Sequence, residues 1–357
     1  MSRKKGFGVV IVLMLAVALV YLLFAPVSIT PAAWTPPVAP ALTGQYEQNT
    51  KLSGVQRISI GDGHKPEDLA FDAEGKIYAG SEDGRIMVVQ PDGTQPRVFA
   101  NTGGRPLGLI FDGHGNLIVA DAIKGLLSVN KSGEVKVLAT EADGVKFGCL
   151  NDLDVGADGT IYFTEASKKF PMSQFTSDLL EHQPNGRLLA LEPHSPRPRT
   201  LLRDLYFANG VAVSPDQAFV LVVETGMYRV RRVWLKEPKM GQNDIFIDNL
   251  PGFPDGISSN GRDRFWLALV TPRQAMFDRM QPYPFMRKMV MRLPKFIQPA
   301  PQRYSFVLGL DLQGRVTQNL QNGSSDCYAE ISNAVEHNGT LYFGSIGEDT
   351  LGRYPLR

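Results

Sequence analysis

An alternation of apolar and polar residues recurs six times along the chain. Each copy has a short polar start, an alternating apolar strand, a tight turn that contains Gly or Asp, and a second strand. The copies begin at Lys65, Arg105, Cys149, Phe207, Phe253 and Glu330. Turns such as Ala-Glu-Gly and His-Asn-Gly suit hairpins, so each copy predicts a β-hairpin.

Six hairpins that cannot bury their own apolar faces predict a closed ring of sheets. We therefore expect an all-β fold, a six-bladed β-propeller over residues 55–357. The chain ends soon after the sixth hairpin, so a strand at 55–60 is expected to complete the sheet of the last blade. The spacing between copies leaves two insertions, near 168–186 and 271–304.

The second insertion is rich in Met, Phe, Arg and Lys and is expected to be a short helical insertion. Three roles fit this composition: a lid that creates an apolar pocket, a surface that contacts a membrane, and a plain cover packed on a blade. The shorter insertion, around 170–181, is expected to form the opposing wall of such a pocket.

The start of the chain departs from the repeat. Arg3, Lys4 and Lys5 precede an uncharged apolar run of about 18 residues, from 7 to 24, which predicts an N-terminal transmembrane helix within residues 1–25. We interpret it as an uncleaved, single-pass signal anchor whose basic end is cytoplasmic, which places the body outside the cytoplasm, in a periplasmic or lumenal space. A cleaved signal peptide is the alternative. Residues 26–54 are rich in Pro, Ala and Thr and lack periodicity, which predicts a spacer.

Composition supports this picture. The 35 Gly and 25 Pro residues are spread along the chain, as many short strands require. With 37 basic and 36 acidic residues the net charge is +1, which argues against a nucleic-acid partner. The two cysteines, Cys149 and Cys327, fall near the starts of the third and sixth copies, on opposite sides of the expected ring, so we expect two buried thiols and no disulfide.

One position recurs at the start of the innermost strand, where it faces the axis of the ring. It holds Glu67, Leu107, Asn151, Asn209, Asp255 and Ile331 in the six copies. Two carboxylates and two amides form a set of hard oxygen ligands that suits Ca²⁺ better than zinc or copper, which favour His or Cys. Asn209 and Asp255 precede glycines, so each alone is also typical of an ordinary turn. Because four polar residues occupy the same position of the repeat, we favour a metal site over four separate turns.

The same segments resemble the strictosidine synthase-like and adipocyte plasma membrane-associated protein family, within the six-bladed gluconolactonase and paraoxonase-like propeller superfamily. The resemblance covers about residues 65–355 and rests on GRLLALEP from Gly186, DLYFANGVAVSPDQAFVLVVET from Asp204, YRVRRVWL from Tyr228, NLPGFPDGIS from Asn249 and the final EHNGTLYFGS. It implies a calcium-dependent hydrolase of small apolar esters or lactones, arylesterase-like or lactonase-like. It also implies that Glu67, Asn151, Asn209 and Asp255 are the metal ligands and that Asp255 acts as base or nucleophile.

Asp255 would be a weak base beside a metal ion, because the metal lowers its pKa, so a second group is needed. The candidates nearest in sequence to the predicted ligands are Asp152, which follows Asn151, and His64, which lies three residues before Glu67. His64 also fits an ordinary loop. No Gly-x-Ser-x-Gly motif occurs, which argues against the common serine hydrolase route.

Two alternatives to the hydrolase remain open. Strictosidine synthases condense an amine with an aldehyde using a glutamate of the sixth blade, and the resemblance places Ser332 there, beside Asn333 and two residues after Glu330. This departure disfavours the condensation. The other alternative is a non-enzymatic binding or scaffold propeller, in which calcium only rigidifies the channel.

Overall fold

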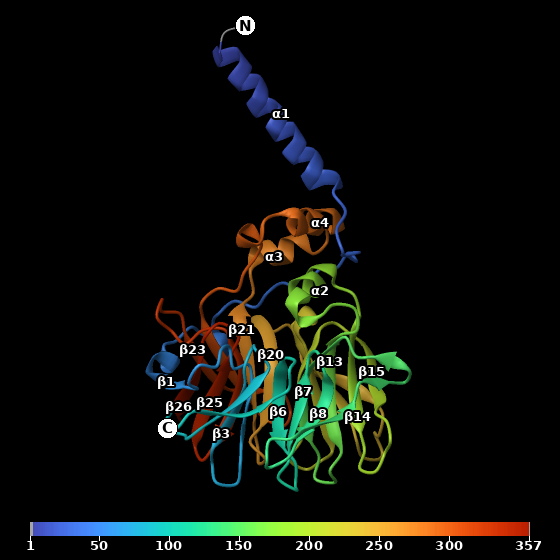
Figure 1. The fold of residues 1–357 in the computed structure, drawn as a ribbon, viewed down its shortest axis with the longest axis vertical. Helices are drawn as coiled ribbons and strands as arrows, with labels where there is room; N and C mark the ends of the chain where they lie inside the picture. Colours follow the sequence, from blue (N-terminus) through green and yellow to red (C-terminus); the bar gives the residue numbers. More distant parts are fainter. Residues whose placement is uncertain (1–2, 357) are drawn as a thin grey trace.

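The six predicted hairpins form the inner strands of six four-stranded antiparallel sheets in the computed structural model, which describes residues 3–356 (Figure 1). The first three sheets contain β2 (Leu69–Phe71), β3 (Ile77–Gly80), β4 (Arg85–Val89) and β5 (Arg97–Asn101); β6 (Pro106–Phe111), β7 (Leu117–Asp121), β8 (Gly125–Val129) and β9 (Val135–Ala139); and β12 (Cys149–Val155), β13 (Ile161–Ser167), β14 (Gly186–Leu191) and β15 (Arg199–Leu205). The next two contain β16 (Ala208–Val213), β17 (Phe219–Glu224), β18 (Arg229–Trp234) and β19 (Asn243–Ile247); and β20 (Gly252–Ser259), β21 (Phe265–Pro272), β22 (Ser305–Leu310) and β23 (Val316–Asn322). The six-bladed propeller is thereby confirmed.

The sixth blade is completed by the two ends of the body. It contains β24 (Ile331–His337), β25 (Thr340–Ser345) and β26 (Thr350–Pro355), and its outer strand is β1 (Gln56–Ser59). β1 pairs antiparallel with β26, with Gln56 opposite Arg353 and Ser59 opposite Thr350. The expected closure by the strand near residues 55–60 is therefore confirmed.

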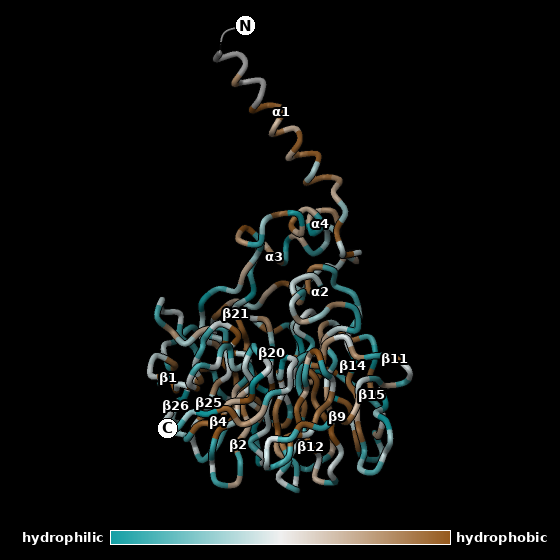
Figure 2. The backbone as a smooth tube through the Cα atoms, viewed as in Figure 1, coloured by the Kyte–Doolittle hydropathy of each residue, from teal (hydrophilic) through white to brown (hydrophobic). Residues whose placement is uncertain are grey.

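The blades pack through their apolar faces, and the innermost strands approach one another closely around the axis. Figure 2 shows hydrophobic residues along the strands inside the body and polar residues on many of the loops. A Cβ at Gly210 would overlap the backbone nitrogen of Ile257, and one at Gly256 would lie 2.6 Å from the carbonyl oxygen of Ser332. Only glycine allows this approach of neighbouring blades. Cys149 and Cys327 are free and buried, as expected.

Both insertions are helical and lie over the same end of the propeller (Figure 1). The first, between β13 and β14, contains η3 (Met172–Gln174) and α2 (Phe175–Glu181). The second, between β21 and β22, contains α3 (Ala275–Met280), α4 (Pro284–Arg292) and η5 (Lys295–Ile297). We call residues 275–297 the cap. Smaller elements are the hairpin β10 (Glu141–Ala142) and β11 (Val145–Lys146), and the turn η4 (Thr225–Met227).

Helix α1 (Arg3–Phe24) extends away from the capped end of the propeller (Figure 1). Figure 2 shows apolar residues along much of its length. Within the part of the chain that the structure describes, no helix combines the length and the hydropathy needed to cross a membrane. The transmembrane anchor therefore stays a prediction.

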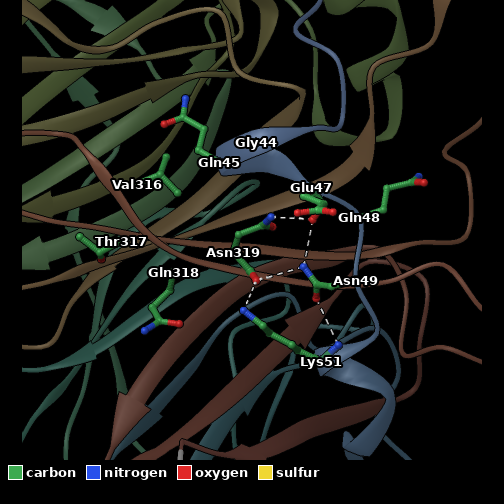
Figure 3. A pocket seen from close by; sticks show the side chains of 10 residues that line it. All are labelled: Gly44, Gln45, Glu47, Gln48, Asn49, Lys51, Val316, Thr317, Gln318 and Asn319. Carbon is green, nitrogen blue, oxygen red and sulfur yellow. Dashed lines mark hydrogen bonds between the residues drawn. The ribbon is translucent and has the colours of Figure 1, made fainter.

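Residues 25–54, called the strap here, run from α1 along the body to β1. The strap includes η1 (Gly44–Tyr46) and η2 (Lys51–Gly54), which lie against the outer strand of the fifth blade. There Asn49 Nδ2 donates to the carbonyl oxygen of Asn319 at 3.2 Å, and Asn319 Nδ2 donates to that of Glu47 at 2.8 Å (Figure 3). These bonds cover the exposed edge of β23, and the polar pocket beside them, of about 380 Å³, contains none of the predicted site residues.

Candidate functional site

Four residues of the predicted column lie on the wall of one cavity at the capped end of the channel. Glu67 lies two residues before β2, and Asn151, Asn209 and Asp255 belong to β12, β16 and β20. All four are buried and line a cavity of about 650 Å³. We call them the polar ring. Asn209 and Asp255 lie within strands, so the turn interpretation does not apply to them, and the glycines that follow serve the close blade packing.

The ring brings two carboxylates together in a buried site. Burial raises the pKa of Asp255 well above its ordinary value, the nearby negative charge of Glu67 raises it further, and a hydrogen bond from Asn209 opposes the shift. Burial also raises the pKa of Glu67, and the guanidinium of Arg105 opposes that shift. Like-charged carboxylates are costly to bury, so this site favours binding of a cation.

Hydrogen bonding within the ring is incomplete. Asn209 Nδ2 donates to Thr225 Oγ1 at 3.1 Å, and Arg105 Nη2 lies 3.4 Å from Glu67 Oε2. Asn151 Nδ2 has no hydrogen-bond partner among the described residues. Two carboxylates and two amide oxygens fit a hard cation such as Ca²⁺. The described residues contain no group of three or more His, Cys, Asp or Glu that could hold a metal. The polar ring has only two such residues, because its other two members are amides.

The rest of the cavity has two different sides. Lys65, Glu82, Arg105 and Glu330, from the first, second and sixth blades, form a charged side. The opposite side is apolar and includes Phe175, Leu179, Phe207, Phe253, Val270 and Phe277. Both insertions therefore line the cavity. The position of Phe277 fits a lid, which is one of the three roles considered for the second insertion.

The structure places Asp152 and His64 away from this cavity lining. His64 is exposed, and its Nδ1 lies 3.4 Å from a carboxylate oxygen of Asp349. Asp152 is buried, and its carboxylate accepts hydrogen bonds from the backbone N–H groups of Val211, at 2.9 Å, and Leu153, at 2.8 Å. The ring residues come together as predicted, whereas these two candidates do not join them.

Asp152 belongs to a set of carboxylates that connect neighbouring blades. Asp68 accepts the N–H of Leu109 on β6 at 2.9 Å, and Asp154 accepts the N–H of Val213 on β16 at 2.7 Å. We call Asp68, Asp152 and Asp154 the staple aspartates. Each satisfies a backbone donor on the innermost strand of the next blade, which stabilises the ring of sheets.

Comparison with known proteins places the chain in a family. The sequence profile of strictosidine synthase matches residues 151–238, and that of the strictosidine synthase-like N-terminal region matches residues 44–89. Protein strictosidine synthase-like 4 of Arabidopsis thaliana is 36% identical over 312 residues, 85% of this chain and 83% of the relative. The chain belongs to the strictosidine synthase-like family.

A second relative of this strictosidine synthase-like chain is the adipocyte plasma membrane-associated protein of Bos taurus, 33% identical over 94% of this chain and 86% of the relative. Among solved structures, a gluconolactonase from Xanthomonas campestris superposes with a TM-score of 0.62 at 18% identity, covering 93% of this chain and 99% of that one. The calcium-binding protein regucalcin of Agrobacterium tumefaciens gives 0.60 at 14% identity, covering 84% and 93%. These two likenesses establish the fold alone.

The sixth blade of the strictosidine synthase-like chain contributes one residue that the sequence alone left unplaced. Ser332 is buried, and its Oγ donates to the carbonyl oxygen of Glu67. Glu330 lines the cavity instead, at a positive φ of 52° and directly before an irregularity in the pairing of β24 with β25. Glu330 and Arg105, like the other charged cavity residues Lys65 and Glu82, lie outside the column of equivalent positions, which therefore could not reveal them.

Proposed function

We propose that this chain is a calcium-dependent hydrolase of esters or lactones that acts in the cavity at the capped end of the channel. The observation that carries the proposal is the polar ring itself: two buried carboxylates and two amides at one end of a cavity that is otherwise largely apolar. Such a cavity, with a few convergent polar groups and shifted pKa values, is typical of a substrate site.

Glu67, Asn151, Asn209 and Asp255 would hold the cation. A bound Ca²⁺ supplies Lewis acidity toward a carbonyl oxygen. Burial and mutual repulsion raise the pKa of Asp255, and burial raises that of Glu67. A bound cation would offset these effects by stabilising the ionised form of both carboxylates, whose two negative charges exceed the single positive charge of Arg105 nearby. The fold is shared with regucalcin, which is a calcium-binding protein, and this likeness supports the choice of calcium.

Asp255 is the residue proposed to attack the carbonyl or to take a proton from water. Its interaction with Asn209 orients the carboxylate, and Asn209 is in turn held by Thr225. Glu330 lines the same cavity and is a second carboxylate available for proton transfer there. The position of Asp152 at a blade junction and of His64 on the surface favours Glu330 over both.

The aromatic and aliphatic side of the cavity favours a substrate with an apolar part. Phe253 and Phe277 pack edge to face, with ring centroids 5.4 Å apart, and Phe207 lines the same wall. A volume of about 650 Å³ admits a small-molecule ester or lactone.

We also propose that α1 anchors the protein in a membrane, with the body outside the cytoplasm. The basic residues at 3–5 precede an uncharged apolar run, and basic clusters stay on the cytoplasmic side of a membrane. The name of the adipocyte plasma membrane-associated relatives supports a membrane location.

The test uses the purified full-length chain with aryl esters and lactones of increasing chain length. We expect hydrolysis that a calcium chelator abolishes and that added calcium restores. Asp255→Asn should lower kcat/KM by roughly 10²–10⁴-fold, the usual contribution of a positioned acid–base group. Turnover that survives both chelation and Asp255→Asn would contradict the proposal, and the absence of any turnover would favour the scaffold function.

Glu330 supports a second candidate, the amine–aldehyde condensation, because it places a sixth-blade glutamate in the cavity. The same preparation can be incubated with aryl amines and aldehydes and the products analysed by mass spectrometry. A product that depends on Glu330 but not on calcium would favour condensation over hydrolysis.

A further inference from the structure

The outer face of the cap exposes an unusual amount of apolar surface. Phe296 is 87% exposed and Met276 is 69% exposed. Tyr283, Phe285 and Ile297 are also more than half exposed. On the strands of the body, by contrast, large exposed apolar residues occur singly, as in most soluble proteins.

The cap has two distinct sides. Its residues Phe277 and Met280 are buried and pack with Phe170, Leu180 and Ile29, and Phe277 lines the cavity. The exposed apolar residues lie elsewhere on the cap and do not line the cavity. A simple lid needs apolar residues on its inner side only, so the outer apolar face needs a further explanation.

The cap is also basic. Residues 275–297 contain five basic residues and one acidic residue, Asp278. The carboxylate of Asp278 is engaged below the cap by Tyr228, at 2.8 Å, and by Arg273, at 2.8 Å. Arg279 and Lys295 are exposed. Apolar and aromatic side chains mixed with basic ones favour the headgroup layer of an anionic membrane.

The cap is fixed directly to the end of α1. Arg292, the last residue of α4, donates to the carbonyl oxygen of Leu22 at 2.8 Å and to that of Ala25 at 2.6 Å. The buried Arg287 donates to the carbonyl oxygens of Leu180, at 3.0 Å, and of Ala32 in the strap. Helix α1, the strap, α4 and α2 are therefore joined by hydrogen bonds.

We propose that the outer face of the cap lies in the headgroup layer of a membrane that contains anionic lipids, so that the cavity receives amphiphilic substrates that partition into that membrane. Figure 1 shows α1 leaving the molecule beside the cap, at the end of the propeller where the cavity lies, so a membrane that holds α1 would meet the cap. The membrane contact rests on the exposed face, its charge and its attachment to α1. Only the delivery of substrates rests on the proposed hydrolase function.

The first test measures the contact without turnover. Full-length protein is placed in vesicles of neutral and anionic phospholipids, with an environment-sensitive fluorophore attached at Phe296→Cys. A matched control carries the fluorophore at Val137→Cys on β9, which is another exposed apolar position. The native cysteines are buried, which favours selective labelling. We expect lipid-borne quenchers to reduce the emission at position 296 and leave that at 137 unchanged, because interfacial helices lie about 5–10 Å into the headgroup boundary.

Equal, weak quenching at both positions would overturn the proposal, as would failure of the protein to float with the vesicles. Protection of position 296 that depends on an added protein, and not on lipid, would also overturn it and would identify the face as a protein-binding surface.

The second test asks what the contact does. The Phe285→Ser, Phe296→Ser double variant is compared with Val98→Ser, Val137→Ser on the outer strands of the first and second blades. For an ester held in vesicles we expect the cap variant alone to raise the apparent KM several-fold, with the hydrolysis of a short soluble ester unchanged. Equal loss on both substrates, or none on either, would overturn substrate delivery. Failure of the wild type to hydrolyse any ester would overturn the hydrolase assignment, and the fluorescence result would still decide the membrane contact.

Discussion

The polar ring and the staple aspartates occupy neighbouring positions along the same chain segments, yet their surroundings differ. Asp68 directly follows Glu67, and Asp152 directly follows Asn151. The staple carboxylates accept backbone N–H groups from the next blade, whereas the ring residues face a cavity and interact mainly with other side chains. In each pair, therefore, one residue serves the architecture and its neighbour in sequence faces the cavity.

The difference separates two kinds of buried polar residue. A buried carboxylate whose oxygens are occupied by backbone donors stabilises the fold, and its replacement leaves those donors unsatisfied. Buried carboxylates and amides that face a cavity with few partners are available for a ligand. Substitution of a staple aspartate should therefore affect mainly stability, whereas substitution of the ring residue beside it should affect mainly ligand binding.

The largest difference in the free energy of unfolding is expected between Asp152→Ala and Asn151→Ala. Asp152→Ala should lower the free energy of unfolding by about 2–6 kcal/mol, because it leaves the N–H groups of Val211 and Leu153 buried without an acceptor, at about 1–3 kcal/mol each. Asn151→Ala should change this free energy little and weaken calcium binding. Denaturant unfolding and calcium titration of both variants measure the two effects, and equal destabilisation would erase the distinction between ring and staple.

Calcium should stabilise the wild type through the ring alone. At a free calcium concentration about 100 times Kd, the expected gain in the free energy of unfolding is about 2.7 kcal/mol. Glu67→Gln should lose this gain, while Glu74→Gln, in the exposed turn after β2, should keep it. Thermal unfolding with and without chelator provides the measurement, and a gain that persists in Glu67→Gln would place the cation elsewhere.

A further expected effect is a pH dependence from a staple residue. Although part of the residue reaches the surface, burial of its carboxyl raises the pKa of Asp154 to about 6, above its ordinary value of 3.8. The folded state therefore holds a proton that the unfolded state releases, so the contribution of Asp154 to stability is complete below about pH 3.8 and is lost as the pH rises toward 6. Asp154→Asn should make the loss of stability between pH 4 and 6 shallower, as followed by denaturant unfolding; an unchanged slope would show that the group does not titrate there.

Much of the fold could be predicted because the repeat is local. A hairpin pattern with its turn residues recurs within short segments, and the position of Asp255 in its copy indicates where it faces. The same column placed Glu67, Asn151 and Asn209 on the wall that they share. Equivalent positions in the repeat thus predict which residues from distant parts of the sequence line the same site.

The remaining features depend on contacts that no repeat encodes. Asp152 was proposed as a partner of Asp255 because it directly follows the predicted ligand Asn151, but its carboxylate binds the backbone N–H of Val211 at a blade junction. The segment predicted as a spacer has no periodicity, yet its backbone is bound by Arg287 and by Asn319. Arg105 and Glu330 reach the cavity from positions outside the column, so only the assembled structure reveals them.

The pairing of β1 with β26 has a consequence for biosynthesis. Gln56 and Arg353 are separated by 297 residues, so the first strand of the body must wait for the last one. At a synthesis rate of about 5–20 residues per second, this wait lasts about 15–60 s. During that time the nascent ring stays open with one strand edge unpaired, a template for mispairing. The ribosome must therefore release almost the whole polypeptide before the propeller can complete its circle.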